Sequence, residues 1–115
     1  MAAAIIPVFN GAVTIAQAID SVLAQEFDGG VELIVVDDGS TDDTAEIVGG
    51  YGARITLVES GGRGPAAARN IGVAVSRGEY VAFLDADDTW LPGKLARMVP
   101  ALARDRDCVM IYSDA

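Results

Sequence analysis

The sequence predicts an α/β fold in which a mainly parallel, open sheet carries helices on both faces. Two observations lead to this prediction. Short apolar runs alternate along the chain with segments whose apolar residues recur at helical spacing. That alternation is typical of βαβ units, which join parallel strands by right-handed crossovers. Residues 31–36 form a run rich in β-branched side chains, the pattern of a strand buried on both faces.

Length and composition describe one ordinary domain. The chain has 115 residues, close to the commonest domain size, with no repeat or linker, so residues 1–115 are expected to form a single domain. The mean hydropathy of +0.35 is high, yet no apolar run reaches the ~18 residues that a membrane span requires. The N-terminal residues show no export signal and the chain has one cysteine. We therefore expect a cytoplasmic protein, with any membrane association arising from regions outside this chain.

The charge balance narrows the classes of partner. Seventeen acidic residues against eight basic ones give a net charge of −9. Such a chain repels a phosphate backbone, so we expect no nucleic acid partner. A small phosphorylated ligand remains compatible with this negative charge, because a metal ion and a few arginines can make the electrostatic potential positive at one site.

The first part of the chain predicts a strand, a helix and a second strand. Apolar residues run from Ala3 to Phe9, and Pro7 should end this strand, because proline lacks the N–H that a central strand donates. After the turn signal Asn10-Gly11, apolar residues recur at helical spacing from Ala12 to Leu23. The second strand is expected over Val31 to Val36.

An acidic segment, residues 37–44, follows the second strand. It should begin a helix that runs to about Val48, because acids in the first turn complement the helix dipole. The residues expected at this helix start are Ser40 or Thr41 as the cap, followed by Asp42 and Asp43. Asp37 and Asp38 precede the cap, at the carboxyl end of the strand, and either shape a turn or face a ligand.

The rest of the chain continues the alternation of elements. We expect a strand over Ile55 to Glu59, a helix over Pro65 to Ala74, a strand over Tyr80 to Leu84, a helix over Trp90 to Leu102 and a strand over Cys108 to Tyr112. Pro65 suits the first position of its helix. The glycine-rich segment before it, with Arg63 and Arg69, is a weak signal for an anion site, because the glycines have the wrong spacing for a known phosphate-binding loop.

Three carboxylates, Asp85, Asp87 and Asp88, follow the strand that begins at Tyr80. A buried strand does not hold ionised carboxylates, so these acids should lie where the strand ends, at the ligand-binding edge of the sheet. One of them could cap the next helix, but this leaves the other two unexplained. The chain has no histidine, so oxygen ligands predominate and favour Mg²⁺ or Mn²⁺.

Five segments in this order and spacing resemble the family 2 glycosyltransferases of GT-A fold. They are Pro7 to Asn10, Ala18 to Gln25, Glu32 to Asp42, Gly64 to Asn70 and Gly78 to Asp88. The resemblance covers nearly the whole chain, and the five segments together are far more specific than any one of them. It implies a Rossmann-like GT-A fold with a mainly parallel sheet, truncated after about the fifth strand.

The same resemblance implies an inverting, metal-dependent transfer of a sugar from a nucleotide diphosphate sugar, above all a UDP-sugar, to an acceptor hydroxyl. The donor-binding residues that it implies are Pro7, Val8, Phe9, Asn10, Asp37, Asp38, Arg69, Asp85, Ala86 and Asp87. Asp38 is similar to the acid that contacts uracil, and Arg69 to the residue that reaches toward the nucleotide. Asp87 and Asp88 are the metal ligands implied for Mg²⁺ or Mn²⁺, although Asp85-x-Asp87 fits the DxD-type motif equally well.

In this family the catalytic base and the acceptor site follow the fifth strand. The resemblance therefore implies that the base lies beyond Ala115, the last residue of the chain, and that the chain itself holds no catalytic residue. It implies a donor-binding half that binds the nucleotide sugar but does not transfer the sugar to its glycan, lipid or protein acceptor.

Apolar surface left uncovered near the last strand should make the chain self-associate. The alternative to an enzyme is a non-catalytic nucleotide- and metal-binding regulatory module of the same fold. A dehydrogenase is disfavoured because no G-x-G-x-x-G follows the first strand.

Overall fold

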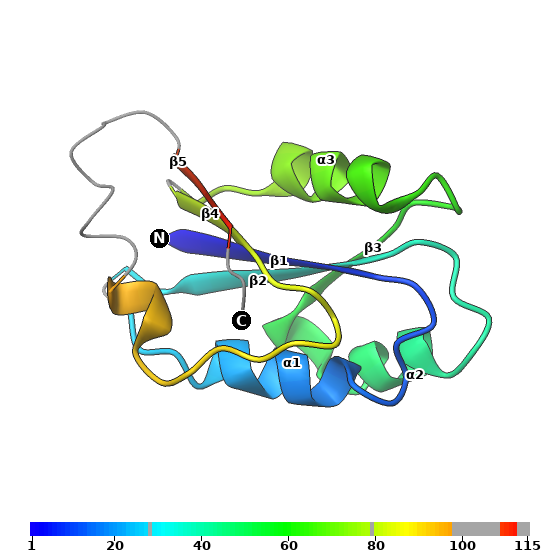
Figure 1. Ribbon diagram of the computed structural model, residues 1–115, viewed down its shortest axis with the longest axis horizontal. Helices are drawn as coiled ribbons and strands as arrows, with labels where there is room; N and C mark the ends of the chain where they lie inside the picture. Colours follow the sequence, from blue (N-terminus) through cyan, green and yellow to red (C-terminus); the bar gives the residue numbers. More distant parts are fainter. Residues whose placement is uncertain (28, 79, 98–108, 113–115) are drawn as a thin grey trace.

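The computed structural model describes residues 1–27, 29–78, 80–97 and 109–112 and has the expected α/β architecture (Figure 1). The strands are β1 (Ala2–Val8), β2 (Val31–Asp37), β3 (Thr56–Glu59), β4 (Tyr80–Phe83) and β5 (Val109–Tyr112). The helices are α1 (Ile15–Leu23), α2 (Thr44–Gly49), the 3₁₀ helix η1 (Gly52–Arg54) and α3 (Pro65–Val75). None of the helices in the described ranges combines the length and the apolar character that a membrane crossing requires.

The described strands form one sheet in the order β3-β2-β1-β4-β5, and each neighbouring pair is parallel. The chain leaves β1 toward β2 and β3, and then returns to the other side of β1 as β4. The strand order therefore reverses between β1 and β4. In open α/β sheets such a reversal creates a crevice beyond the carboxyl ends of the strands.

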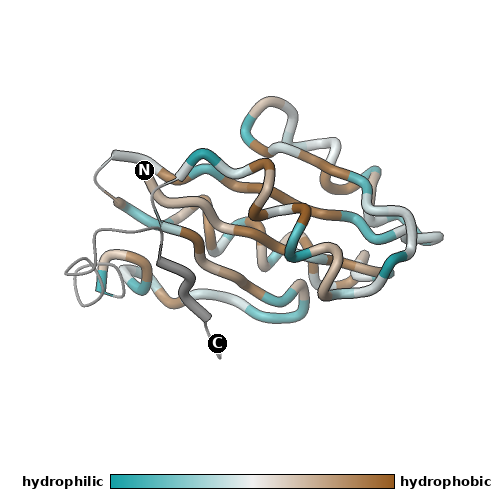
Figure 2. The backbone as a smooth tube through the Cα atoms, turned by 90° about the horizontal axis from the view of Figure 1, so that it is seen from above, coloured by the Kyte–Doolittle hydropathy of each residue, from teal (hydrophilic) through white to brown (hydrophobic). Residues whose placement is uncertain are grey.

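Helices cover both faces of the sheet, with α1 and α2 on one face and α3 on the other (Figure 1). Alternate residues of β1 supply the two cores: Ile6 packs with Ile19 of α1, whereas Ile5 packs with Ala68 of α3. Gly72 of α3 lies so close to the sheet that a Cβ there would stand 2.5 Å from Ile5 Cγ2. Figure 2 shows apolar stretches along the central strands and hydrophilic residues mainly in the turns.

Pro7 lies inside β1, which ends one residue later at Val8. The Ile5 carbonyl accepts the N–H of Leu84 on the β4 side (3.0 Å), and the pairing with β4 ends at Ile5. Backbone groups alternate between the two sides of a strand, so the nitrogen of Pro7 points to the side where β4 no longer pairs. The central strand therefore accommodates proline without losing a ladder hydrogen bond.

The expected start of α2 is wrong. The helix begins at Thr44, after Asp43, whose side chain makes no capping bond to the described residues. Asp42 serves this end of the helix by accepting the N–H of Thr44 (3.0 Å). Ser40 and Thr41 cannot cap α2 because both bind the loop after β1, as described below.

The segment after β4 agrees with its prediction in part. Trp90 and Leu95 are buried, with 3% and 0% exposure, and act as core anchors. Leu91 is 66% exposed although the helical spacing places it on the apolar face, because the helical residues begin only at 94. Residues 94–97 are helical.

Three expectations concern positions that the structure does not describe. The helix that starts near Trp90 is expected to continue to Leu102, the last strand to begin at Cys108, and the catalytic base to lie beyond Ala115. Leu102, Cys108 and Ala115 all lie outside the described residues. These three expectations therefore stay predictions.

Candidate nucleotide-binding cavity

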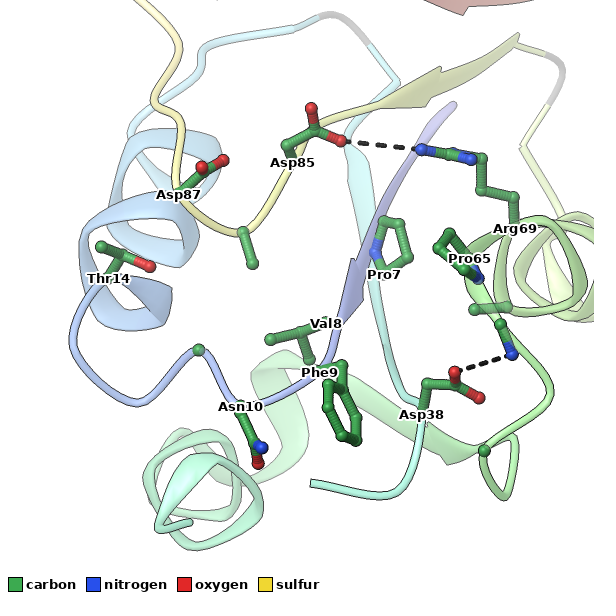
Figure 3. A pocket seen from close by; sticks show the side chains of 15 residues that line it. Pro7, Val8, Phe9, Asn10, Thr14, Asp38, Pro65, Arg69, Asp85 and Asp87 are labelled. Carbon is green, nitrogen blue, oxygen red and sulfur yellow. Dashed lines mark hydrogen bonds and ion pairs between the residues drawn. The ribbon is translucent and has the colours of Figure 1, made fainter. Parts of the chain in front are cut away.

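A cavity of about 760 Å³ lies at the reversal of strand order, beyond the carboxyl ends of β1, β2 and β4 (Figure 3). Four segments line it: the loop after β1, the end of β2, the start of α3 and the loop after β4. The lining residues are Pro7, Val8, Phe9, Asn10, Gly11, Thr14, Asp38, Gly62, Gly64, Pro65, Ala68, Arg69, Asp85, Ala86 and Asp87.

The cavity brings together all but one of the residues expected to bind a donor, and the exception is Asp37. Of the two expected metal ligands, Asp87 lines the cavity and Asp88 does not. Six lining residues are not among the predicted site residues: Gly11, Thr14, Gly62, Gly64, Pro65 and Ala68. The glycine-rich segment before α3 is the available signal for Gly62 and Gly64, and the family segment Gly64 to Asn70 is the signal for Pro65 and Ala68, whereas no motif indicates Thr14.

Asp38 fastens the glycine-rich segment to the end of β2. Its Oδ1 accepts the hydroxyl of Ser60 (2.6 Å) and the N–H of Arg63 (2.9 Å), and its Oδ2 accepts the N–H of Gly64 (2.9 Å). Gly64 has φ +99°, a conformation that other residues rarely adopt. The Ser60 hydroxyl and a backbone hydrogen bond from Gly62 both lower the pKa of this carboxylate, and Asp38 is only 7% exposed. Asp38 thus shapes the cavity wall chiefly through its bonds to the glycine-rich segment.

Asp37 has a structural role instead of the expected ligand contact. It is 3% exposed, and its Oδ1 accepts the N–H of Ser40 (3.0 Å) within the turn that follows β2. Strand alternation explains the difference between the two neighbouring acids, since adjacent side chains point to opposite faces.

Hydrogen bonds tie the loop after β1 to residues 40–44, which follow β2 and include the start of α2; four of them have distances of 2.8–3.1 Å. These four are Asn10 N–H to Ser40 Oγ (2.8 Å), Thr41 N–H to Asn10 Oδ1 (2.8 Å), Gly11 N–H to Thr44 Oγ1 (3.0 Å) and Ala12 N–H to Asp42 Oδ2 (3.1 Å). Asn10 has φ +52°, which asparagine tolerates better than most residues. The bonds hold Phe9, which is 60% exposed, at the edge of the cavity. A planar apolar surface therefore lies on the same side as Asp38 (Figure 3).

Arg69 approaches the opposite side of the cavity from α3. Its guanidinium lies 3.8 Å from Asp85 Oδ1, and the two side chains are 37% and 63% exposed. So exposed an ion pair contributes little to stability. The pair does place the Arg69 guanidinium beside the acids. An anionic ligand can take the place of Asp85 as the partner of this guanidinium.

The residues 85–89, which we call the acid loop, carry the carboxylates that follow β4. The side chains of Asp85 and Asp87 are exposed and line the cavity, whereas Asp88 is half-buried and its N–H closes a turn onto the Asp85 carbonyl (3.0 Å). Within the described residues, no three acidic, histidine or cysteine side chains gather into a metal site. A cation held here would therefore depend on oxygens from its ligand as well as from the protein.

The model of the family described as Glycosyl transferase family 2 matches residues 3–113. The chain belongs to this family. Among curated members, an uncharacterised glycosyltransferase of Rickettsia prowazekii is 38% identical over 109 residues, which are 94% of this chain and 34% of that protein. The chain thus spans about a third of the length of the curated glycosyltransferases that it matches.

Solved glycosyltransferases share the fold. S. aureus TarS 1–349 in complex with UDP-GlcNAc has a TM-score of 0.76 and 30% identity over 90% of this chain and 31% of that TarS 1–349 chain. The mannosyltransferase PcManGT of Pyrobaculum calidifontis, in complex with GDP-Man and Mn²⁺, has a TM-score of 0.81 and 34% identity over 89% of this chain and 32% of that protein. The GT-A fold implied by the sequence motifs is confirmed.

Acid is expected to destabilise this glycosyltransferase chain through two carboxylates at the cavity. The hydroxyl of Ser60 holds the pKa of Asp38 below its ordinary value of 3.8, and that of Thr44 does the same for the pKa of Asp42. Because the folded pKa is the lower one, the ionised forms stabilise the fold above pH ~4, and this stability is lost as the pH falls through the folded pKa. Thermal unfolding between about pH 6 and pH 2.5 measures it.

In that experiment Asp38→Asn and Asp42→Asn should each flatten the fall in unfolding temperature below pH ~4. Asp43→Asn removes an equal charge from an exposed position and serves as the matched control. An unchanged slope in both test variants would show that these carboxylates are not the source of the acid sensitivity.

Proposed function

We propose that this chain is the donor-binding part of an inverting glycosyltransferase that transfers a sugar from a UDP-sugar to an acceptor hydroxyl with the help of a divalent cation. One observation carries the proposal. A single cavity has a buried carboxylate, Asp38, at one side and two exposed carboxylates, Asp85 and Asp87, at another. The first suits a nucleobase, and the others suit a cation on a diphosphate.

The proposed base subsite consists of Asp38 and Phe9. Uracil presents an N–H at position 3, which a carboxylate accepts, and an aromatic face that can lie against a phenyl ring. Cytosine presents a lone pair at that position and would be repelled by Asp38. Guanine also has ring and amino N–H groups, so GDP is the competing nucleotide. The complexes of TarS with UDP-GlcNAc and of PcManGT with GDP-Man support both bases, and the similarity of Asp38 to the uracil-binding acid favours UDP.

The residues at the acid loop fit a divalent cation. Asp85 and Asp87 offer oxygen ligands at the cavity wall, and Mg²⁺ or Mn²⁺ is commonly held by one or two carboxylates together with substrate phosphates. The Mn²⁺ in the PcManGT complex supports this choice of ion. We assign Asp87 as the principal protein ligand, since Asp88 does not line the cavity. When bound, the cation would stabilise the charge that develops on the leaving diphosphate.

Arg69 and the start of α3 complete the proposed diphosphate subsite. The net charge of −9 opposes binding of a bare diphosphate, so local cations must offset it. Arg69 and the metal supply positive charge from two sides. Pro65 and Ala68 put the start of α3 in the cavity wall, so the positive end of this helix dipole lies near the same region.

Inversion requires a base that deprotonates the acceptor hydroxyl. The acids that line the described cavity are Asp38, Asp85 and Asp87, and the proposal already uses them for the nucleobase and the cation. We propose that residues of the full-length protein beyond Ala115 supply the base and the acceptor site, so the 115 residues alone bind the donor without transferring the sugar. A cytoplasmic location and self-association of the isolated chain are part of the same proposal.

Isothermal titration of the chain with UDP tests the proposal. With Mn²⁺ we expect at least about tenfold tighter binding than in excess EDTA, and tighter binding of UDP than of CDP. GDP binding tighter than UDP would reassign the nucleotide, and equal affinity with and without EDTA would remove the cation from the proposal. Hydrolysis of a UDP-sugar by the full-length protein would distinguish an enzyme from the regulatory alternative.

A further inference from the structure

Two polar side chains at the end of α1 bind the chain that leaves the acid loop. Ser21 lies in the last turns of α1 and Gln25 just beyond its end, and neither lines the cavity. Both belong to the Ala18 to Gln25 segment of the family motif, to which the donor site assigns no function. Figure 1 shows the yellow chain after β4 passing along α1 before the orange helical turn.

Gln25 makes three hydrogen bonds although it is only 8% exposed. Its Nε2 donates to the carbonyls of Leu91 (2.9 Å) and Ser21 (3.2 Å), and its Oε1 accepts the N–H of Leu95 (3.1 Å). The Leu95 N–H belongs to the first turn of the helical residues 94–97, where backbone donors lack partners within the helix. The Gln25 amide therefore caps this turn from a different helix.

Ser21 completes the contact one residue nearer to the acid loop. Its hydroxyl donates to the Ala18 carbonyl (2.7 Å) and accepts the N–H of Trp90 (3.1 Å). The Trp90 side chain is 3% exposed and packs in the same core as Val22. Both the backbone and the side chain of Trp90 are thus fixed to α1.

The acid loop is consequently a short bridge between two anchors. On one side, the N–H of Leu84 binds the Ile5 carbonyl (3.0 Å) and the Leu84 side chain is fully buried. On the other side lies Trp90, whose N–H binds Ser21. Gln25 binds Leu91 and Leu95, which follow Trp90. The positions of Asp85 and Asp87 relative to Asp38 therefore depend on both anchors.

We infer that Ser21 and Gln25 are positioning residues for the acid loop, and that the affinity for a cation-bound diphosphate depends on them. This inference rests on the proposed function. A nucleoside without phosphates should not depend on either residue, because its subsite lies at Phe9 and Asp38. Ser21 is also too far from the cavity to contact the ligand directly. Roughly 10 Å along the helix axis separates it from Thr14, which lines the cavity, given the rise of 1.5 Å per residue.

The first test is hydrogen exchange in the chain without ligand. Gln25→Met keeps the length of the side chain and removes its three hydrogen bonds. We expect the amides of residues 86–95 to exchange about tenfold faster than in the wild type, while those of residues 38–44 keep their rates. Gln17→Met makes the same change at an exposed position of α1 and should change neither region. Exchange at 86–95 that stays at the wild-type rate overturns the inference.

The second test compares two ligands by titration. For Gln25→Met we expect about tenfold weaker binding of UDP with Mn²⁺ and an affinity for uridine within about twofold of the wild type. Ser21→Ala, which removes a single hydrogen bond to the chain that leaves the acid loop, should show a smaller loss of the same kind and serves if Gln25→Met does not fold. Equal losses for UDP and uridine would mean that these residues only stabilise the fold, which overturns the inference. If the wild type instead binds UDP with equal affinity in the presence and absence of Mn²⁺, the proposed function is overturned, and this inference with it.

Discussion

Replacing Asp87 with asparagine is expected to remove most of the metal-dependent affinity for UDP. Asp87 is an exposed carboxylate at the cavity wall, and no group of three metal-binding side chains exists among the described residues to replace it. An amide oxygen is a much weaker ligand for Mg²⁺ or Mn²⁺ than a carboxylate. We expect a loss of about a hundredfold in UDP affinity with Mn²⁺ and little change in EDTA. Titration of the wild type and the variant under both conditions measures this.

Asp88→Asn is the matched control for this prediction. It removes the same unit of charge from the neighbouring residue, so any general effect on the field around the cavity is shared. Asp88 is half-buried, and its N–H rather than its carboxylate makes the observed turn onto Asp85. We expect a loss of less than about threefold. A larger loss in Asp88→Asn than in Asp87→Asn would move the metal ligand to Asp88.

The succession of strands and helices along the chain and the position of the acids could be predicted from the sequence, because both depend on local pattern. A β-branched run followed by Asp37 and Asp38 indicates a buried strand and its carboxyl end, and the same logic places the acid loop after β4. Parallel strands then bring these ends to one edge of the sheet. The resemblance to the family added roles for individual residues, which pattern alone does not supply.

The contacts that shape the cavity could not be predicted, because they join segments far apart in the chain. Ser40 resembles a helix cap in the sequence, yet its hydroxyl binds Asn10, 30 residues earlier. Gln25 binds the carbonyl of Leu91, 66 residues later. Periodicity reports only which face of an element is apolar, so it cannot show which loop a polar side chain will meet. Two adjacent acids also differ in their positions, since Asp38 lines the cavity and Asp37 lies in a turn.

Replacing Asp38 with asparagine is expected to reduce both the affinity for UDP and the discrimination against CDP. The carboxylate accepts three protein hydrogen bonds and, in the proposed complex, the N–H of uracil. An amide must place its NH₂ group either at the Oδ1 position, against the N–H of Arg63, or at the Oδ2 position, against the N–H of Gly64, so one donor must face another donor. We expect UDP affinity to fall about tenfold to a hundredfold. The preference for UDP over CDP should fall with it, because the amide can donate to cytosine.

Asp37→Asn provides the control, since it changes an adjacent buried acid that does not line the cavity. Its amide oxygen can still accept the N–H of Ser40, so we expect UDP affinity within about threefold of the wild type. Thermal unfolding at neutral pH reports whether either variant loosens the fold. A loss of affinity in Asp38→Asn without any change in the ratio of UDP to CDP would mean that Asp38 acts only by holding the glycine-rich segment through Ser60 and Gly64. A loss of UDP affinity with unchanged affinity for uridine monophosphate would place the lost contact at the phosphates instead, and would contradict the assignment of Asp38 to the base.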